Sequence, residues 1–330
     1  MAFDNVDRKV LHAVYDAANA PITLLAKKAR VSREIAEYRL AKMQQEGIIT
    51  GFRTKIRMSY FCDGVATVFF KLVRSDKARY TQILNYLVSH PSINWVAEVC
   101  GNADIVITFF YRSPEDLGNT MSEITEFMGE NLREHDLSLY LTEFKFSRKG
   151  VIYGKAEPQK NDESIQFKGK LLSHVDVDET DRIILDEIAL DCRMKKNVLA
   201  KKTGVSEDTV RLRIRNMEKA GVIFGYITLI DMNRMGLESY YVRFQFEKPG
   251  RETFAKVAYY AETNPYVVYY STAAGRYNVI MSVEAKNRQH FNELLIDMRT
   301  EFGSLISNYE FQLVLKEHKA VYLPKGYLFR

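Results

Sequence analysis

A single offset of 174 positions relates the two halves of this 330-residue chain. Identical residues recur at this offset without a gap: Asp7-Arg8 and Asp181-Arg182, Leu25–Lys28 and Leu199–Lys202, Val31-Ser32 and Val205-Ser206, and, further along, Gly101 and Gly275. A period this long indicates two copies of a unit with several elements, and not a solenoid of short repeats. The sequence therefore predicts a tandem duplication, in which each half folds in the same way.

The boundaries follow from the repeat and from composition. A polar stretch with a proline, residues 157–164, is typical of a linker. The predicted domains are 1–57 and 58–154 in the first half, a linker over 155–174, and 175–231 and 232–330 in the second half.

The start of the second half predicts three helices with a tight turn. Acidic residues at 178–181 precede an apolar helical stripe and favour a helix N-terminus. Residues 198–203 predict a short helix closed by Gly204, because glycine accepts the positive φ of a tight turn. Ser206 is then the expected N-cap of a helix that buries Val210, Ile214 and Met217. With a β-ribbon expected after Gly221, this is the pattern of a winged helix-turn-helix.

The first half repeats the pattern, with Ser32 as the expected cap of a helix that buries Ala36, Leu40 and Met43. Arg30 stands where the turn glycine is expected. A non-glycine residue there implies local strain or another turn geometry.

Charge points to nucleic acid as the partner of these segments. Between Pro21 and Arg57, nine lysines and arginines face three acids, and the same counts hold between Arg193 and Lys219. Such clusters neutralise DNA phosphates and release counterions. An ordinary solvated helix face is the alternative for one helix, but an equal excess in both halves favours DNA binding.

We expect the second helix of each helix-turn-helix to contact double-stranded DNA. Arg39 and Arg213 occupy matching positions on an expected exposed flank, where a base contact would contribute about 1–3 kcal/mol. The candidate DNA-binding residues are Lys27, Lys28, Ser32, Arg33, Tyr38, Arg39, Lys42, Lys201, Lys202, Ser206, Thr209, Arg211, Arg213 and Asn216. Packing is an equal alternative for Tyr38, and helix capping for Ser32 and Ser206.

The rest of each half is α+β and not basic. The patterns predict strands, helices and turns in the order β-α-β-β-α-β, which is that of a ferredoxin-like sandwich. One sheet face is left open, and pairing with the other copy would cover it. The predicted fold class is therefore α+β, with two copies of a winged helix-turn-helix followed by a ferredoxin-like domain.

The combination resembles the Lrp/AsnC family of transcription regulators. The segments that carry the resemblance are 178–185, 199–206, 209–223 and 275–279, with 6–11, 25–32, 35–49 and 101–106 in the first half. The resemblance implies a DNA-binding regulator that assembles into homo-oligomers and binds a small effector of the amino-acid class. The effector turn of the family usually reads Gly-x-Tyr-Asp, which places the candidate effector residues at Gly101, Asn102, Asp104, Gly275, Arg276, Tyr277 and Asn278.

Neither half has the complete effector turn, so three interpretations stay open: amino-acid sensing, a changed ligand, or a turn kept for folding. Two copies in one chain imply a covalent pseudo-dimer. Because Glu37 and Ala41 stand opposite Arg211 and Arg215, the two helices should prefer different sequences and an asymmetric operator.

Two alternatives remain. A DNA-architectural protein uses similar basic patches without sequence choice, and a branch resembling the same family decarboxylates sirohaem by means of histidines. The six histidines show no metal-ligand spacing, so we expect no enzyme, catalytic residue, metal or cofactor. Three scattered cysteines, no signal segment and no long apolar run predict a cytoplasmic, DNA-associated protein without a membrane partner.

Overall fold

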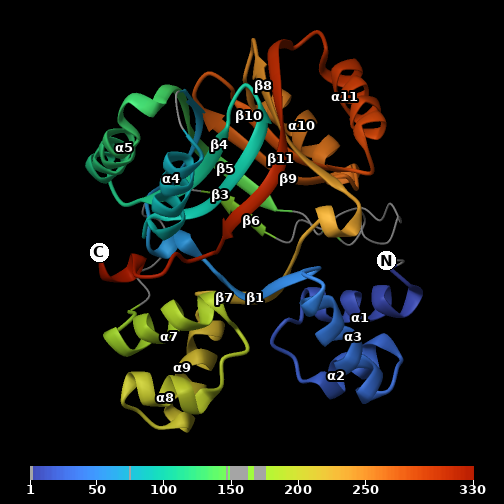
Figure 1. The fold of residues 1–330 in the computed structure, drawn as a ribbon, viewed down its shortest axis with the longest axis vertical. Coiled ribbons are helices and arrows are strands. Elements are labelled where there is room, and N and C mark those ends of the chain that lie inside the picture. The colour runs from blue at the N-terminus through green and yellow to red at the C-terminus, as the bar shows by residue number, and fades with distance from the viewer. Residues whose placement is uncertain (1–2, 74–75, 146–147, 149–162, 167–175) are drawn as a thin grey trace. The chain divides into compact units, whose positions relative to one another are not determined.

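A computed structural model describes residues 3–73, 76–145, 148, 163–166 and 176–330. By their contacts the residues group into two compact units, each built from separate stretches of chain (Figure 1). Unit 1 comprises 1–61, 172–235 and 321–330, and unit 2 comprises 62–171 and 236–320. Both predicted helix-turn-helix segments thus fall in unit 1, and both predicted ferredoxin-like domains contribute to unit 2.

Unit 1 contains the predicted helices in both halves. Its helices are α1 (Asn5–Tyr15), α2 (Ile22–Ala29), α3 (Arg33–Gln45), α7 (Glu179–Leu190), α8 (Lys196–Thr203) and α9 (Glu207–Lys219). Ser32 and Ser206 cap α3 and α9 as expected, each accepting a backbone N–H three residues on. Gly204 and Arg30 both adopt left-handed backbone, with φ of 71° and 56°. Arg30 therefore carries the strain that its position in the sequence implied.

The expected wing within each half is corrected by the structure. Residues 49–56 and 223–230 each form one continuous strand, β1 (Ile49–Ile56) and β7 (Ile223–Ile230), and these two strands pair antiparallel with each other. A single strand without a turn cannot fold back on itself, so its hydrogen bonds go to the strand from the other half. This ribbon joins the two helix-turn-helix segments within unit 1.

The last ten residues of the chain pack with unit 1. Leu323 and Tyr327 are fully buried, and Asp186 of α7 accepts a hydrogen bond from the Gly326 N–H at 2.6 Å. A short 3₁₀ helix, η4 (Tyr327–Phe329), contacts α7. Of the predicted domain 232–330, residues 236–320 thus belong to unit 2, whereas residues 232–235 and 321–330 belong to unit 1.

Unit 2 contains the β-α-β-β-α-β order twice. In the first half these elements are β2 (Gly64–Leu72), α4 (Lys77–Ser89), β3 (Ile93–Gly101), β4 (Ile105–Tyr111), α5 (Pro114–Met128) and β5 (Leu132–Lys145). In the second half they are β8 (Glu238–Phe246), α10 (Arg251–Thr263), β9 (Val267–Ala274), β10 (Val279–Ala285), α11 (Arg288–Phe302) and β11 (Ile306–Ala320).

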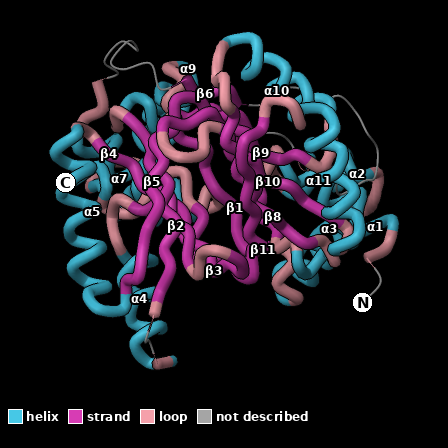
Figure 2. The backbone as a smooth tube through the Cα atoms, turned by 90° about the horizontal axis from the view of Figure 1, so that it is seen from above, coloured by secondary structure: helices cyan, strands magenta, loops and turns pink. Residues whose placement is uncertain are grey.

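The strands of the two halves join in one sheet. Its order is β2-β4-β3-β11-β8-β10-β9-β5, and β5 pairs again with β2, so these eight strands close into a ring. The long last strands make the closure, because β5 pairs with β2 through its first part and with β9 through its second, while β11 pairs with β8 and then β3. Figure 2 shows α4 and α5 on one side of these strands and α10 and α11 on the other.

A ninth strand lies within the predicted linker. Residues 163–166 form β6 (Glu163–Gln166), which pairs with the end of β5. The other residues of the segment 155–174 lie outside the described part of the chain. The pairing of β5 with β2 ends at Leu139, and β6 pairs with β5 beyond that point, where its backbone groups find partners.

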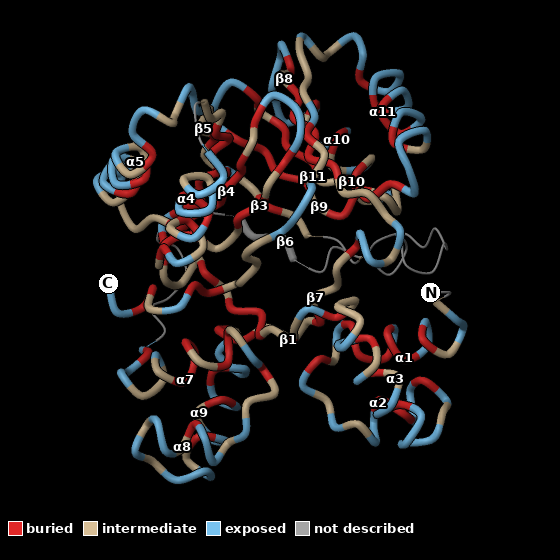
Figure 3. Tube along the Cα trace, in the orientation of Figure 1, coloured by how far each residue is buried: buried red, intermediate tan, exposed pale blue. Residues whose placement is uncertain are grey.

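Unit 2 has two apolar cores, one between the strands of the first half and α4 and α5, and one between the strands of the second half and α10 and α11. Figure 3 shows these strands and parts of the helices as buried. The strand faces turned inward carry aromatic and charged groups. Arg243 is 3% exposed, bonds Asp136 of the first half at 2.7 Å and Glu310 of the second at 2.6 Å, and lies 3.7 Å from the Phe69 ring centroid. A buried guanidinium is tolerable because two carboxylates and an aromatic face surround it.

Candidate nucleic-acid interface

The second helix of each helix-turn-helix has one buried and one exposed face. In α9 the predicted stripe of Val210, Ile214 and Met217 is buried, whereas Arg211, Leu212, Arg215 and Asn216 are exposed. In α3 the buried residues are Ala36, Leu40 and Met43, as predicted. We call α3 and α9 the recognition helices, because an exposed polar face of such a helix is what enters a DNA groove.

Arg39 and Arg213 are not free on an exposed flank, which corrects their predicted placement. The Arg213 guanidinium contacts Asp178 at 2.7 Å and Asp181 at 3.1 Å, at the start of α7. The backbone N–H of Asp181 and the Arg213 charge hold the pKa of Asp178 below its usual value. These two ion pairs use Nη1 of Arg213 and hold its side chain against the start of α7.

Arg39 has the matching arrangement in the first half, with Asp4 at 2.8 Å and Asp7 at 3.1 Å. The acidic residues at 178–181 are also the helix start that the sequence predicts, since Asp178 caps α7. Asp4 caps α1 in the same way. The recurrence of both an aspartate pair and an arginine at the offset of 174 was the available signal for the contact.

Most of the other candidate residues are exposed. They are Lys27, Lys28, Ser32, Arg33, Tyr38, Lys201, Lys202, Ser206, Arg211 and Asn216, whereas Lys42 and Thr209 are half-buried. Some of these cations have acidic neighbours: Lys202 bonds Glu187 at 2.7 Å, and Arg211 bonds Asp208 at 2.8 Å. Arg215 and Lys219 of α9 are exposed as well, and no ion pair is seen for either among the described residues.

The two recognition helices present different chemistry. On α3, Arg33 bonds Glu37 at 2.8 Å, and the large exposed side chains are Ile35 and Tyr38. Tyr38 is 64% exposed, so it does not pack as a core residue within unit 1. The exposed face of α3 thus carries an aromatic and an apolar side chain, whereas that of α9 carries Leu212 together with arginines and an asparagine.

Buried hydroxyls link the two helix-turn-helix segments. Thr54 of β1 donates to the Ile188 carbonyl at 2.7 Å, and Thr228 of β7 donates to the Val14 carbonyl at 2.9 Å. Both bonds cross from one half to the other and both hydroxyls are buried, so they fix each helix-turn-helix against the strand of its neighbour. Sequence analysis missed these residues, because nothing in a strand sequence reveals which chain segment lies behind it.

The candidate effector glycines lie where two strands approach closely. A Cβ on Gly275 would lie 2.9 Å from the Ser138 Oγ and 3.0 Å from the Leu137 carbonyl oxygen of β5. A Cβ on Gly101 would lie 3.0 Å from the Phe311 carbonyl oxygen of β11. Each glycine therefore admits the last strand of the other half, which is the strand that closes the ring.

The following residues of these turns also have structural partners. The Asn278 amide accepts from the Phe246 N–H at 3.0 Å and donates to the Phe246 carbonyl at 3.1 Å. Asp104 accepts from the Leu72 N–H at 2.8 Å and pairs with Lys71 at 3.0 Å. Tyr277 is buried against Arg243, so Asn102 and Arg276 are the candidates, apart from the two glycines, that are exposed. These contacts support the interpretation of the turn as one kept for folding, while effector binding stays a prediction.

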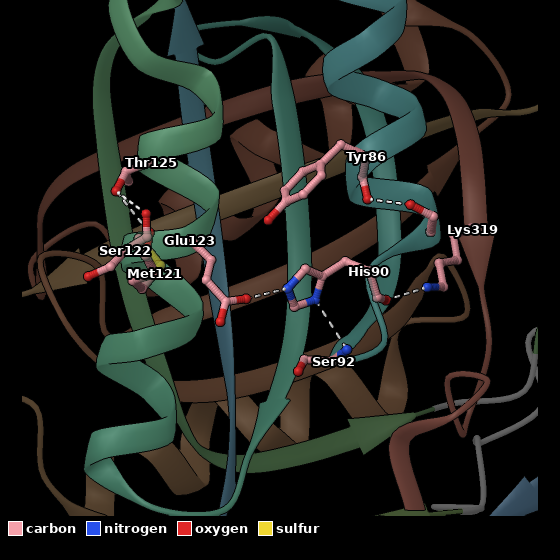
Figure 4. A network of polar contacts seen from close by, with 9 residues as sticks. Tyr86, His90, Ser92, Met121, Ser122, Glu123, Thr125 and Lys319 are labelled. Carbon is pink, nitrogen blue, oxygen red and sulfur yellow. Dashed lines mark hydrogen bonds and ion pairs between the residues drawn. The ribbon is translucent and has the colours of Figure 1, made fainter. Parts of the chain in front are cut away.

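No group of three or more metal-ligating side chains occurs among the described residues. Among the described histidines His90 is buried, and its Nε2 lies 3.3 Å from a Glu123 oxygen while its Nδ1 accepts the Ser92 N–H (Figure 4). Its carbonyl accepts a hydrogen bond from Lys319 at 2.9 Å. In the second half the corresponding residue is Asn264, which also accepts a backbone N–H two residues on, so this position secures a loop in both halves. His174 lies outside the described residues.

Residues 177–223 match the family model for winged helix-turn-helix DNA-binding domains. The chain carries a helix-turn-helix of the winged class, in which β1 and β7 together form the ribbon. It is 27% identical over 126 residues to the HTH-type transcriptional regulator FL11 of Pyrococcus horikoshii, covering 38% of this chain and 82% of that protein. It is 26% identical to the transcriptional regulator AzlB of Bacillus subtilis, covering 43% of this chain and 91% of AzlB. Over 60 residues it is 40% identical to LrpA of P. horikoshii, covering 18% of this chain and 43% of LrpA.

All three relatives are transcriptional regulators by name. Each of these relatives matches less than half of the present chain. A solved structure with the whole-chain fold is the siroheme decarboxylase NirDL, at a TM-score of 0.61 and 14% identity, covering 98% of this chain and 96% of NirDL. At that identity the similarity concerns the fold alone. Among the described helices none is long and apolar enough to span a bilayer.

Proposed function

We propose that the chain is a sequence-specific DNA-binding transcription regulator, and that its tandem-duplicated halves act as a covalent pseudo-dimer. The observation that carries the proposal is unit 1 itself. Two helix-turn-helix segments, each with an exposed recognition helix, are joined there by the β1–β7 ribbon and the Thr54 and Thr228 hydrogen bonds. Paired helix-turn-helix modules read two half-sites whose spacing the protein sets.

The basic residues around the recognition helices support phosphate contacts. Lys27, Lys28 and Lys201 are exposed in the helices that precede α3 and α9. Exposed lysines there can neutralise DNA phosphates independently of sequence. Base contacts then belong to the exposed face of α9, where Arg215 and Asn216 are suited to guanine and adenine.

The test is fluorescence anisotropy of the full chain with the duplex upstream of its own gene, beside a scrambled duplex, at about 150 mM salt. An affinity for the upstream duplex that is about 1,000-fold higher than that for the scrambled duplex supports a sequence-specific regulator. Equal, salt-sensitive binding to both duplexes favours the architectural alternative, provided that selection from random duplexes also enriches no sequence. Absence of binding at low salt overturns the proposal.

The whole-chain fold similarity to NirDL supports a second candidate, a porphyrin-binding or sirohaem-decarboxylating enzyme. A change in the absorbance of sirohaem on mixing with the chain, followed by release of carbon dioxide, would favour this candidate. DNA binding without any spectral change favours the regulator.

An effector of the amino-acid class and further homo-oligomers belong to this proposal as predictions. Asn102 and Arg276 are the exposed candidate side chains of their turns. If an amino acid binds at the turn of the second half, the Arg276→Ala variant should bind it more weakly than the wild-type chain. Sedimentation of the full chain measures the oligomeric state.

A further inference from the structure

A cavity of about 380 Å³ lies in unit 1 between the two helix-turn-helix segments. The first half contributes Asn19 and Ala20 to its lining, and the second contributes the segment 192–196 that precedes and begins α8. The remaining walls include Ile188 and Ile214. Cavities that hold small ligands usually have volumes of about 300–1,000 Å³, so this one has room for a small molecule.

The charge of the lining is one-sided. Arg193, Lys195 and Lys196 line the cavity, and no aspartate or glutamate does so among the described residues. Cys192 adds no negative charge, because burial raises the pKa of its thiol to about 12. Burial also lowers the pKa of Lys196, as expected for a cation with little solvent. The lining therefore combines several cations with no carboxylate, while Asp191 and Glu218 act on Arg193 and Lys196 from outside the lining.

Arg193 is held in place but retains a free donor. Its side chain lies 3.6 Å from the Phe52 ring centroid, and its Nε donates to the Ala18 carbonyl at 2.6 Å. Its Nη2 is buried and finds no hydrogen-bond partner among the described residues. A buried guanidinium donor without a partner is costly unless a ligand supplies an acceptor.

The charges are confined to one half. At the offset of 174, Asn19, Pro21 and Ile22 stand where the second half has Arg193, Lys195 and Lys196. The repeat scaffold therefore does not require these cations. The first half folds with neutral residues at the start of α2, which are the natural substitutions for a test.

We propose that this cavity binds one small carboxylate with an apolar body per chain. The carboxylate would accept from Arg193 and face Lys195 and Lys196, since charge-assisted hydrogen bonds from a guanidinium suit carboxylates. The body would contact Ile188, Met194 and Ile214, which are the apolar walls. Because both halves line the cavity, the ligand would bridge the two helix-turn-helix segments.

The test is isothermal titration calorimetry of the full chain at low ionic strength, with benzoate and inorganic phosphate as probes and chloride as the reference anion. We expect one saturable benzoate site per chain, weaker phosphate binding and no saturable chloride binding. Lys196→Ile should weaken benzoate binding by about tenfold or more, and Lys195→Gln should weaken it as well. Lys256→Gln removes an equal charge from α10 in unit 2 and should leave binding unchanged, and unfolding curves should show that all variants fold.

Three results would overturn the assignment. These are the absence of saturable benzoate binding, equal binding by wild type and Lys196→Ile, or phosphate binding without benzoate binding. A different outcome is that benzoate does not bind and that Lys196→Ile reduces the slope of log K for DNA against log salt concentration by about one. The cavity then holds a DNA phosphate. The calorimetry contains no DNA, so its outcome is independent of the proposed function.

Discussion

At the scale of single residues, some matching positions of the two halves carry the same side chain and others carry different ones. The Arg39 and Arg213 ion pairs are matched, but Arg193 is matched by Asn19 and His90 by Asn264. A residue that is alike in both halves is most simply explained by a requirement of the fold. A residue that differs is a better candidate for a task that one half performs alone.

Arg213→Ala tests the distinction between positioning and base contact. Loss of the contacts with Asp178 and Asp181 should lower the free energy of unfolding by up to about 1 kcal/mol, because the pairs are partly exposed. Arg215→Ala, on the exposed face of the same helix, should change stability by less than about 0.5 kcal/mol and weaken DNA binding by about tenfold. Urea denaturation and anisotropy separate the two effects. If Arg213→Ala loses sequence preference without losing stability, Arg213 contacts a base.

Lys319 should make the stability of unit 2 depend on pH. Burial lowers its pKa to about 8, whereas the usual value is 10.5. Between these values the folded state binds fewer protons than the unfolded state, so the free energy of unfolding should rise from pH 8 to pH 10. Lys319→Met should abolish that rise relative to wild type, and Lys316→Met, at an exposed position of the same strand, should retain it. Urea denaturation at several pH values measures the difference; identical slopes for both variants would refute the assignment.

At the scale of elements, the last strand of each half decides the architecture of unit 2. A four-stranded ferredoxin-like sheet has two free edges, and β5 and β11 extend beyond their own halves to pair with β9 and β3. The ring removes those edges, which otherwise invite association with other chains. The same strands require the glycines at 101 and 275, because a side chain there would meet their backbone.

Gly275→Ala should destabilise the chain by about 1–3 kcal/mol. The new Cβ would lie within 3.0 Å of the Ser138 Oγ and the Leu137 carbonyl oxygen, so β5 must shift. Gly118→Ala is the control, because this exposed glycine of α5 has no atom within 4 Å of a new Cβ, and alanine favours helices by about 0.5–1 kcal/mol. Thermal unfolding of both variants measures the contrast. Equal stabilities would show that the close approach at Gly275 is not limiting.

At the scale of the whole molecule, one chain carries two unlike recognition helices in a fixed pair. A dimer of identical chains presents two equal helices and reads a palindrome. Here α9 offers Arg211 and Arg215 where α3 offers Glu37 and Ala41. The covalent link between the halves allows the two helices to differ within every molecule.

The double substitution Arg211→Glu and Arg215→Ala gives α9 the residues that α3 carries at the matching positions. Selection from random duplexes should enrich an asymmetric site with the wild-type chain, and the variant should change the preference in one half-site only. Sequencing of the selected pools measures both preferences. A palindrome selected by the wild-type chain would contradict the proposed asymmetric reading.

Much of the fold was predictable because its signals are local. The capping serines at 32 and 206, the buried stripes of α3 and α9 and the order of strands and helices depend on residues close in sequence. The site was less predictable. The recognition helices were found, but the partners of Arg39 and Arg213 and the structural contacts of Asn278 come from segments 32 or more residues away.

The repeat and its periodicities are properties of the chain, so they predicted the elements, their order and the two helix-turn-helix segments. The pairing of β1 with β7, the closure of the ring and the cavity between the halves were decided by the tertiary structure. Hydrophobic periodicity records which face of a strand is buried but not which strand lies beside it. Edge strands with similar patterns can pair within a half or between halves, and only the packed molecule selects the partner that leaves no buried backbone group unsatisfied.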